Sequence, residues 1–482
     1  METIKNSEDN KITIYPVTRI EGHAKITIHL DNDLKVDKVY FHVDQFRGFE
    51  KFSEGRHFKE MPIITAKICG ICPVSHILGA VKAGDMIMGV NIPYTAKLLR
   101  ELIHMGQIIQ SHSLHFFYLA SPDLLLGWDE NPKIRNIAGV IEKYPDIATK
   151  GVELRKFGQS IIEWIAGARI NPKWIVPGGM ANSLTPQVKD KILLNLPKVK
   201  SHILFTINLF KDYIQKNKDF IIDYANFDTG YLGLVSNNDS LELYDGKIRY
   251  FDKNLITKIE FLPKDYLNYI AEYIEDWSYL KFPFLKIYGY PEGVYRVGPL
   301  ARLNIINKID TELANKELQE FKNLSNNGKA VSASFYYHYA RLIEILYAIE
   351  KVELILNDKE ILSKDVYIEN KVVNEEGIGV IEAPRGTLIH HYWVDEKGTI
   401  KKVNMIVASG HNNWAMSKAV EVIAKKYIDM NNLTEGILNR VEGGIRCYDP
   451  CLSCSTHAVG NMPILIEIYD NQKKLIKTIK RE

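Results

Sequence analysis

The chain has 482 residues, of which 46% are hydrophobic, so it is long enough for one large core or for several domains. Its 61 Lys and Arg residues nearly balance 59 Asp and Glu residues, and the net charge of +2 predicts no general attraction to nucleic acid or to a membrane. The sequence has no signal-peptide core and no apolar run near the roughly 18 to 20 residues that cross a bilayer, so we expect a cytoplasmic protein.

The N-terminal quarter of the chain changes from a strand pattern to a helix pattern. Apolar and polar residues alternate in three early segments, which predicts an antiparallel β meander. These segments are residues 11–15, 24–30 and 36–43. From about Thr95 the apolar residues recur at helical spacing, so we expect a long buried helix that reaches Phe117.

The middle of the chain is mostly helical by the same criterion. Helices are expected at residues 158–168, 188–224, 266–279 and 332–356. Pro197 would kink the second of them. Between residues 241–244 and 247–251, Asp245-Gly246 is a strong two-residue turn signal, so we expect a hairpin there that forms a surface flap.

The last quarter of the chain returns to strand patterns before a helix that starts at about Asn413. The strands are expected at residues 377–383, 387–393 and 400–407. No linker, repeat or charge block marks a domain boundary. We therefore predict an α+β fold: a predominantly helical single domain with a central bundle of long helices and small peripheral antiparallel β elements near both termini.

Five cysteines are too few for a disulfide scaffold, and four of them form two Cys-x-x-Cys pairs. Cys69 and Cys72 lie near the N-terminus, Cys451 and Cys454 lie near the C-terminus, and Cys447 matches no pair. Two cysteines at i and i+3 chelate one ion, so the pairs supply four thiolates. A four-cysteine zinc site and an iron–sulfur cluster both remain open, although zinc modules usually close a much shorter loop.

A histidine follows each cysteine pair. His76 comes four residues after Cys72, and His457 comes three residues after Cys454. Such histidines donate hydrogen bonds to sulfur or bind a further ion, which an isolated zinc or iron–sulfur site does not require. The pattern therefore favours a metal centre that performs chemistry over a purely structural one.

Six motifs, in the same order along the chain, resemble those of the large subunits of nickel-iron hydrogenases. They are Arg19-Ile20-Glu21-Gly22-His23, Arg47-Gly48-Phe49-Glu50, the Cys69/Cys72 segment, Pro177-Gly178-Gly179, Ala383-Pro384-Arg385-Gly386 and residues 449–457. The cysteine motifs with their Asp-Pro prefix are highly specific. The resemblance runs from end to end and implies a catalytic subunit of the cytoplasmic group 3 type that splits or forms dihydrogen.

By this resemblance the chain would hold nickel and an iron that carries cyanide and carbon monoxide. The four thiolates would divide into terminal ligands of nickel, Cys69 and Cys451, and ligands that bridge nickel to iron, Cys72 and Cys454. His76 would donate to a bridging sulfur, and Ser409 would hydrogen-bond a cyanide. Soft thiolates agree with a soft metal site, but their spacing alone indicates neither nickel nor diatomic ligands.

The resemblance also implies a proton relay and a charged cover over the metals. Glu21 would take protons from a nickel thiolate, although the residues alone favour a carboxylate held by Arg19 or His23. Above the open face of the metals the family places residues that match Arg385, Asp123 and Asp449.

Arg385 is unsuitable as the base, because deprotonating a guanidinium near neutral pH costs roughly 7 kcal/mol. We assign the base to Cys451, and expect Arg385 to be a fixed donor whose rotamer is set by Asp123 and Asp449.

A second metal site and a removable tail are further implications of the resemblance. Glu50 and His457 would bind a magnesium or iron ion near the C-terminus. Residues 1–457 would form the mature domain, and a maturation endopeptidase would remove residues 458–482 after His457. The strand patterns in this tail, at residues 463–469 and 474–479, predict a hairpin.

The partners follow from what the sequence lacks. It contains no pyridine-nucleotide, flavin or phosphate-loop motif, so electrons must leave through another chain. The resemblance implies an iron–sulfur small subunit, and then heterodisulfide reductase reached through an electron-transfer subunit, as in methanogen hydrogenases that do not reduce deazaflavin. Alternatives are a deazaflavin-reducing enzyme, a regulatory dihydrogen sensor, and a quinone-site subunit, which would lack the four thiolates.

Overall fold

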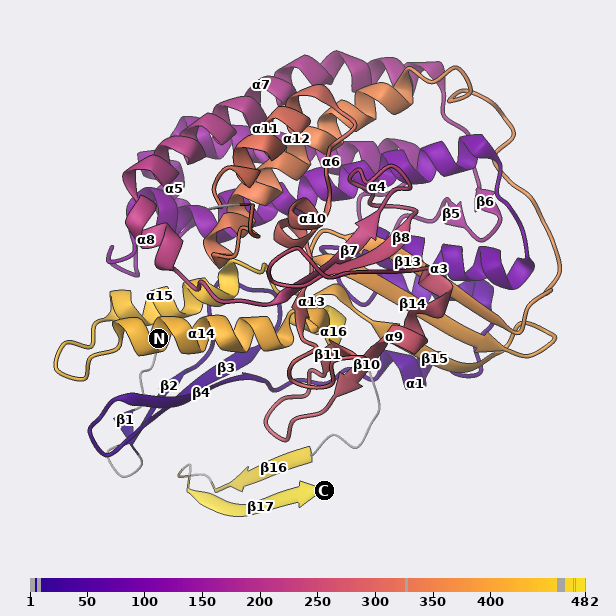
Figure 1. Ribbon diagram of the computed structural model, residues 1–482. Helices are drawn as coiled ribbons and strands as arrows, with labels where there is room; N and C mark the ends of the chain where they lie inside the picture. Colours follow the sequence, from indigo (N-terminus) through magenta and orange to yellow (C-terminus); the bar gives the residue numbers. More distant parts are fainter. Residues whose placement is uncertain are drawn as a thin grey trace.

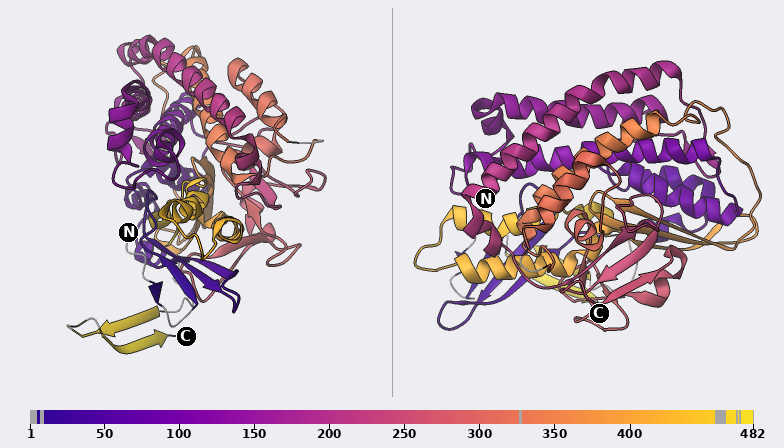
Figure 2. Two further views of the ribbon diagram at one scale, coloured as in Figure 1. Left: turned by 90° about the vertical axis from the view of Figure 1, so that its left-hand side faces the viewer. Right: turned by 45° about the horizontal axis from the view of Figure 1, so that its top comes forward.

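The computed structural model describes residues 5–6, 10–325, 328–456, 464–470, 472 and 474–481. Long helices form one layer of the molecule, and small sheets with short helices lie on one side of that layer (Figure 1). Figure 2 shows the same arrangement from two further directions.

The helical layer contains a bundle of long helices. They are α4 (Tyr94–Leu114), α6 (Pro145–Ala166), α7 (Pro186–Lys216) and α12 (Tyr337–Leu356). Helices α6 and α12 both pack against α4 and against α7. Because α4 lies inside the bundle, it buries polar residues as well as apolar ones, including His104, Gln107 and His112.

A three-stranded antiparallel sheet lies beside the bundle. Its strands, in order, are β13 (Glu376–Ala383), β14 (Gly386–Val394) and β15 (Ile400–Ile406). Helix α3 (Pro73–Met88) packs on β13. It begins at Pro73, which needs no hydrogen-bond partner in the first turn, and ends at Gly89 in the left-handed conformation. Since α3 starts directly after Cys72, its packing fixes the position of that cysteine.

Further sheets surround this centre. A four-stranded antiparallel sheet contains β1 (Lys5–Asn6), β2 (Lys11–Ile14), β3 (Ala24–Leu30) and β4 (Val36–Val43). A mixed sheet contains, in order, β12 (Tyr295–Arg296), β7 (Gly230–Val235), β8 (Lys247–Phe251) and β9 (Lys258–Phe261). Two-stranded pairs are β5 (Ile175–Val176) with β6 (Gly179–Met180), β10 (Ile270–Tyr273) with β11 (Phe282–Leu285), and β16 (Ile464–Tyr469) with β17 (Leu475–Arg481).

Shorter helices connect these layers. The α-helices are α1 (Phe49–Ser53), α2 (Met61–Ala66), α5 (Ile137–Lys143), α8 (Lys218–Asp223), α9 (Tyr266–Tyr269), α10 (Pro299–Ile305), α11 (Glu312–Lys322), α13 (Ala408–His411), α14 (Asn413–Tyr427), α15 (Glu435–Arg446) and α16 (Leu452–Ser455). Single turns are η1 (Phe58–Glu60), η4 (Pro263–Asp265) and η5 (Ser334–Tyr336). Two π-helical segments, η2 (His115–Ala120) and η3 (Pro122–Leu126), continue α4.

The predicted fold class is confirmed, as are the early meander, the helix from Thr95, the later strands and the C-terminal hairpin. The segment 158–168 is the C-terminal half of α6, which starts earlier, at Pro145. The segment 188–224 divides into α7 and α8, and Pro197 lies inside α7 without ending it.

Two predictions for the middle of the chain are wrong. The segment 266–279 is helical only in α9, because Ile270 and its neighbours pair with β11 and bury their apolar side chains there. The expected flap is also wrong: β8 pairs with β7 and β9, and Leu241 and Tyr244 lie in the core. In both cases tertiary contacts outweigh the local pattern.

None of the helices in the described ranges is both long enough and apolar enough to cross a membrane. The hairpin of β16 and β17 projects away from the bundle (Figure 1).

Candidate metal centre

The two cysteine pairs meet at the centre of the fold. The sulfur atoms of Cys69, Cys72, Cys451 and Cys454 all lie within 4.8 Å of one another. Cys451 Sγ is 3.2 Å from Cys69 Sγ and 2.9 Å from Cys454 Sγ, and Cys72 Sγ is 3.3 Å from Cys454 Sγ. Each side chain is 5% exposed or less. Cys447 lies apart, with its thiol 3.7 Å from His338, and burial raises its pKa to about 12.

Main-chain contacts bring the two ends of the chain together. Glu21 donates its N–H to Pro450 and accepts from the N–H of Leu452, so a short parallel bridge aligns Glu21 with Cys451. Gly22 allows this close approach. Its φ is 88°, and a Cβ there would lie 2.8 Å from the Cβ of Leu452. The glycine of the Arg19–His23 motif thus has a steric role.

The thiols influence each other's protonation. Burial raises the pKa of Cys451 and of Cys454, whereas hydrogen bonds with the neighbouring thiols lower that of Cys69. Four thiolates at these distances repel one another. A cation between the sulfur atoms would remove that repulsion and allow all four to lose their protons.

Glu21 contacts the cluster directly. Its Oε2 atom accepts from the Cys451 thiol at 3.1 Å and from the N–H of Ser453 at 3.1 Å. These partners, rather than Arg19 or His23, hold its carboxylate. The arrangement places a proton acceptor in contact with one sulfur of the cluster.

Arg385 lies over the sulfur atoms and is held mainly by Asp449. Its Nε donates to the Asp449 carbonyl at 2.5 Å, and its Nη2 lies 3.0 Å from Oδ2 of the same residue. Burial alone would lower the pKa of Arg385, but Asp449 and the nearby thiolates hold that pKa well above its usual value. The guanidinium is therefore a permanent cation at the site.

Asp123 occupies a different place from the expected one. Its carboxylate contacts Arg19 at 2.5 Å, Asn439 at 2.9 Å and Arg446 at 3.1 Å. The second contact of Arg385 is instead the Ser111 hydroxyl, at 3.4 Å. The expectation that Asp123 sets the rotamer of Arg385 is thus not matched by the contacts of either residue. Sequence reasoning also missed Ser111, which has no motif to signal it.

Two further predicted residues lie beside the cluster. The Ser409 hydroxyl accepts from the N–H of Cys451 at 2.8 Å, so it supports the loop that carries that cysteine. His76, on the first turn of α3, lies with its Nδ1 atom 3.1 Å from Nε2 of His390, a partner that the sequence did not indicate. Burial lowers the pKa of His76 to about 4, and its ring is therefore neutral near pH 7.

The proposed second metal site is only partly described. Glu50 is in α1, and its Oε1 atom accepts from the N–H of Met405 at 2.7 Å. Burial raises the pKa of this carboxyl to about 7. His457 lies outside the described residues.

Models of known families match most of the chain. One described as nickel-dependent hydrogenase matches residues 47–126 and 235–457, and one described as HoxL-like matches residues 11–46. Together these segments contain the Glu21 loop, both cysteine pairs and Arg385.

Individual relatives align along almost the whole chain. The beta subunit of the NAD-reducing hydrogenase HoxS of Cupriavidus necator is 40% identical, over 97% of this chain and 98% of its own. A subunit of the F420-non-reducing hydrogenase vhc of Methanococcus voltae is 42% identical, over 97% of this chain and 100% of its own. A crystal structure of an NAD+-reducing nickel-iron hydrogenase in the H2-reduced state gives a TM-score of 0.90 at 40% identity, covering 95% of this chain and 100% of that one. The chain therefore belongs to the nickel-dependent hydrogenase family, in which it is a catalytic large subunit of the nickel-iron type.

Proposed function

We propose that the chain catalyses the heterolytic cleavage and formation of dihydrogen at a nickel-iron centre, whose iron carries cyanide and carbon monoxide. The observation that carries the proposal is the convergence of four buried sulfur atoms within 4.8 Å. These donors fit the group, because thiolates favour soft metals. When bound, the centre polarises dihydrogen as a Lewis acid and accepts its two electrons.

The four cysteines would divide the work of holding it. Cys69 and Cys451 are proposed as terminal ligands of nickel, and Cys72 and Cys454 as ligands shared with iron. Cys451 is the thiol that contacts Glu21, which suits a terminal sulfur that takes up a proton. Ser409 would keep the Cys451 loop in place. His76 lies in the same buried region and supports the first cysteine segment.

Proton movement is assigned to Cys451 and Glu21. A proton on the Cys451 sulfur passes to Oε2 of Glu21: the S–H bond breaks, an O–H bond forms, and the electron pair stays on sulfur. At 3.1 Å, this transfer needs no intervening water. Arg385 acts as a fixed donor and positive charge, because releasing its proton near neutral pH costs roughly 7 kcal/mol.

A second cation and a cleavable tail complete the proposal. Glu50 and His457 would bind magnesium or iron. A buried carboxylate such as Glu50 is costly to ionise unless a cation lies beside it. Residues 458–482 would be removed after His457 by a maturation endopeptidase, leaving residues 1–457 as the mature domain.

Electrons would leave to an iron–sulfur small subunit that docks beside the cysteine segments. The Arg47 side chain donates to the carbonyls of Ile68 and Ser453, so it links both segments. Near it in the sequence, Phe46 is 44% exposed and Phe52 is 58% exposed. Large apolar side chains left in solvent are typical of an interface. We place the complex in the cytoplasm.

For the final acceptor, we propose heterodisulfide reductase, reached through an electron-transfer subunit. The names of the methanogen relatives support an enzyme that does not reduce deazaflavin. The similarity to NAD-reducing hydrogenases favours NAD+ as a second candidate, reached through a partner with its own nucleotide site.

The proposed function is tested by purifying the native complex without oxygen and supplying dihydrogen with one acceptor at a time. Dihydrogen-dependent reduction of a viologen dye, absent in a Cys454→Ser complex, is the expected result. Reduction of heterodisulfide identifies the preferred acceptor, and reduction of NAD+ identifies the second. Turnover that is too slow for catalysis with every acceptor would support a dihydrogen sensor instead.

A further inference from the structure

The loop between β2 and β3 carries Glu21 in a conformation that must be actively held. Arg19 has a φ of 56°, in the left-handed region, which costs a residue with a side chain about 1 kcal/mol. Residues 18–22 are only half-buried in this chain. Contacts from the body of the protein must therefore offset the strain and fix the loop.

One set of contacts holds the side chain of Arg19. Its Nη2 donates to Asp123 Oδ1 at 2.5 Å and to Asn439 Oδ1 at 2.9 Å, and its Nη1 donates to the Leu119 carbonyl at 3.0 Å. Leu119 and Asp123 lie in the two π-helical segments that continue α4. This irregular stretch thus turns a carbonyl and a carboxylate toward the loop.

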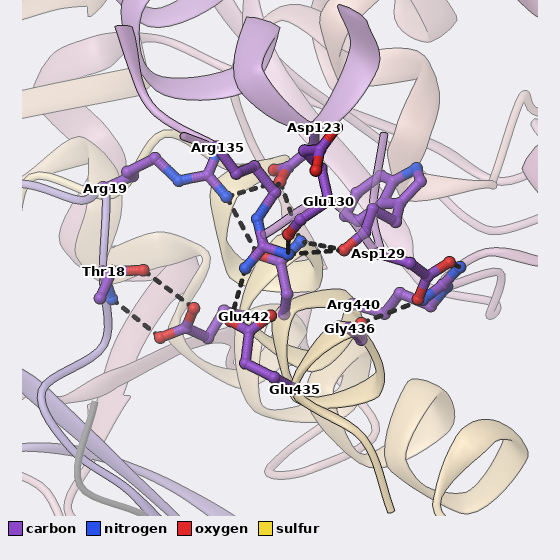
Figure 3. Close-up of polar contacts among 12 residues, drawn as sticks. Thr18, Arg19, Asp123, Asp129, Glu130, Arg135, Glu435, Gly436, Arg440 and Glu442 are labelled. Atoms are coloured by element: carbon purple, nitrogen blue, oxygen red, sulfur yellow. Dashed lines mark hydrogen bonds and ion pairs between the residues drawn. The ribbon is translucent and has the colours of Figure 1, made fainter. Parts of the chain in front are cut away.

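A second set of contacts holds Thr18. The N–H of Thr18 donates to Glu442 Oε1 at 2.9 Å, and its hydroxyl donates to Glu442 Oε2 at 2.9 Å. Figure 3 shows the Thr18 and Arg19 contacts reaching the same end of α15 from one side. Arg446 joins the two sets, because it contacts Glu442 Oε2 at 3.2 Å and Asp123 Oδ2 at 3.1 Å.

We propose that Asp123 and Glu442 are positioning residues that fix the Glu21 loop and so maintain the contact between Glu21 and Cys451. This inference rests on the proposed function of Glu21 as the proton acceptor. Neither carboxylate touches the cluster in the described structure. The oxygens of Asp123 are occupied by Arg19, Asn439 and Arg446, so it anchors the loop and does not carry protons onward.

The effect on function follows from distance. The proton moves between Cys451 Sγ and Glu21 Oε2, which are 3.1 Å apart. A shift of about 1 Å in such a geometry can slow a reaction by about 100-fold. Weakening either anchor would release the strained backbone of Arg19 and let the loop move.

The inference is tested on the metal-loaded complex with Asp123→Asn and Glu442→Gln. Amide hydrogen exchange, measured by mass spectrometry on a peptide that contains residues 17–22, should become faster in both variants. The solvent deuterium isotope effect on dihydrogen oxidation should increase and kcat should fall by about 10-fold, while KM for dihydrogen is unchanged. Asp129→Asn is the matched control, because it removes an exposed ion pair to Arg440 on the same helix, α15.

Thr18→Val keeps the test decisive if the charge variants fold poorly, because it removes only one hydrogen bond to Glu442. Thr18→Ser should restore the slow exchange of the loop. The inference is overturned if loop exchange stays at the wild-type rate in these variants, or if the loop opens with no change in the isotope effect. Glu21→Gln separates the two claims: full turnover in that variant rejects the proton relay, while the exchange data still decide whether the anchors hold the loop.

Discussion

The Sγ atom of Cys451 lies 3.1 Å from the Oε2 atom of Glu21, although the two residues are 430 positions apart in the chain. A main-chain bridge between the same two residues fixes this contact. The N-terminal loop therefore completes a site whose sulfur atoms come from both ends of the chain. Folding of the whole chain must precede assembly of the site.

Glu21→Gln should lower dihydrogen oxidation by about 100-fold, the usual contribution of a positioned acid or base. The amide keeps the hydrogen bond from Ser453 but accepts no proton. Nickel and iron contents should stay at the wild-type level, as measured by elemental analysis. Glu54→Gln, which alters a surface pair with Lys51, serves as the control and should retain wild-type activity.

Arg385→Lys should also lower activity by about 100-fold while the metals remain bound. Lysine keeps the charge, but it cannot donate at once to the Asp449 carbonyl, its carboxylate and Ser111 as the guanidinium does. A lysine variant more active than wild type at high pH would contradict the account, since it would indicate that this residue acts as the base.

Glu344→Gln should lower the free energy of unfolding by about 3 kcal/mol, as breaking a buried ion pair does. Glu344 is fully buried, and although burial raises its pKa, Arg302 and His112 hold that pKa at about 2. Thermal unfolding of the purified chain measures the effect as a lower Tm. Glu312→Gln, in an exposed pair with Lys316, should leave Tm unchanged.

Glu101 should make the protein less stable as the pH rises from about 4.5 to 7. Burial raises the pKa of its carboxyl to about 7 from the usual value of 4.5, despite the nearby Lys351. Within that window the folded state binds more protons than the unfolded chain, so the free energy of unfolding falls with pH. Glu101→Gln should flatten this slope in denaturant titrations, and an unchanged slope would reject the assignment.

Motifs that are contiguous in the sequence predicted the site well. The two Cys-x-x-Cys segments and the Arg19–His23 motif each bring a functional side chain to the cluster, and each is specific enough to recognise alone. Long helices were predictable for a similar reason, because the apolar spacing of α4 persists over its whole length.

Contacts between distant segments were not predictable in the same way. Asp123 was assigned to Arg385, whereas its carboxylate binds Arg19, because the side chains that it meets are set by the π-helical turn after α4. Glu442 and Arg446, spaced i and i+4 on α15, gave an ion-pair signal that did not reveal Thr18 as the further partner. Similarly, β10 forms only because β11 is available to pair with it.

The central claim is tested most directly by elemental analysis and infrared spectroscopy of the complex purified without oxygen. The account predicts nickel and iron in nearly equal amounts, with absorption bands of cyanide and carbon monoxide, and the loss of both metals in Cys451→Ser. Zinc alone, with no band in the cyanide and carbon monoxide region, would contradict it and leave the four cysteines as a structural zinc site.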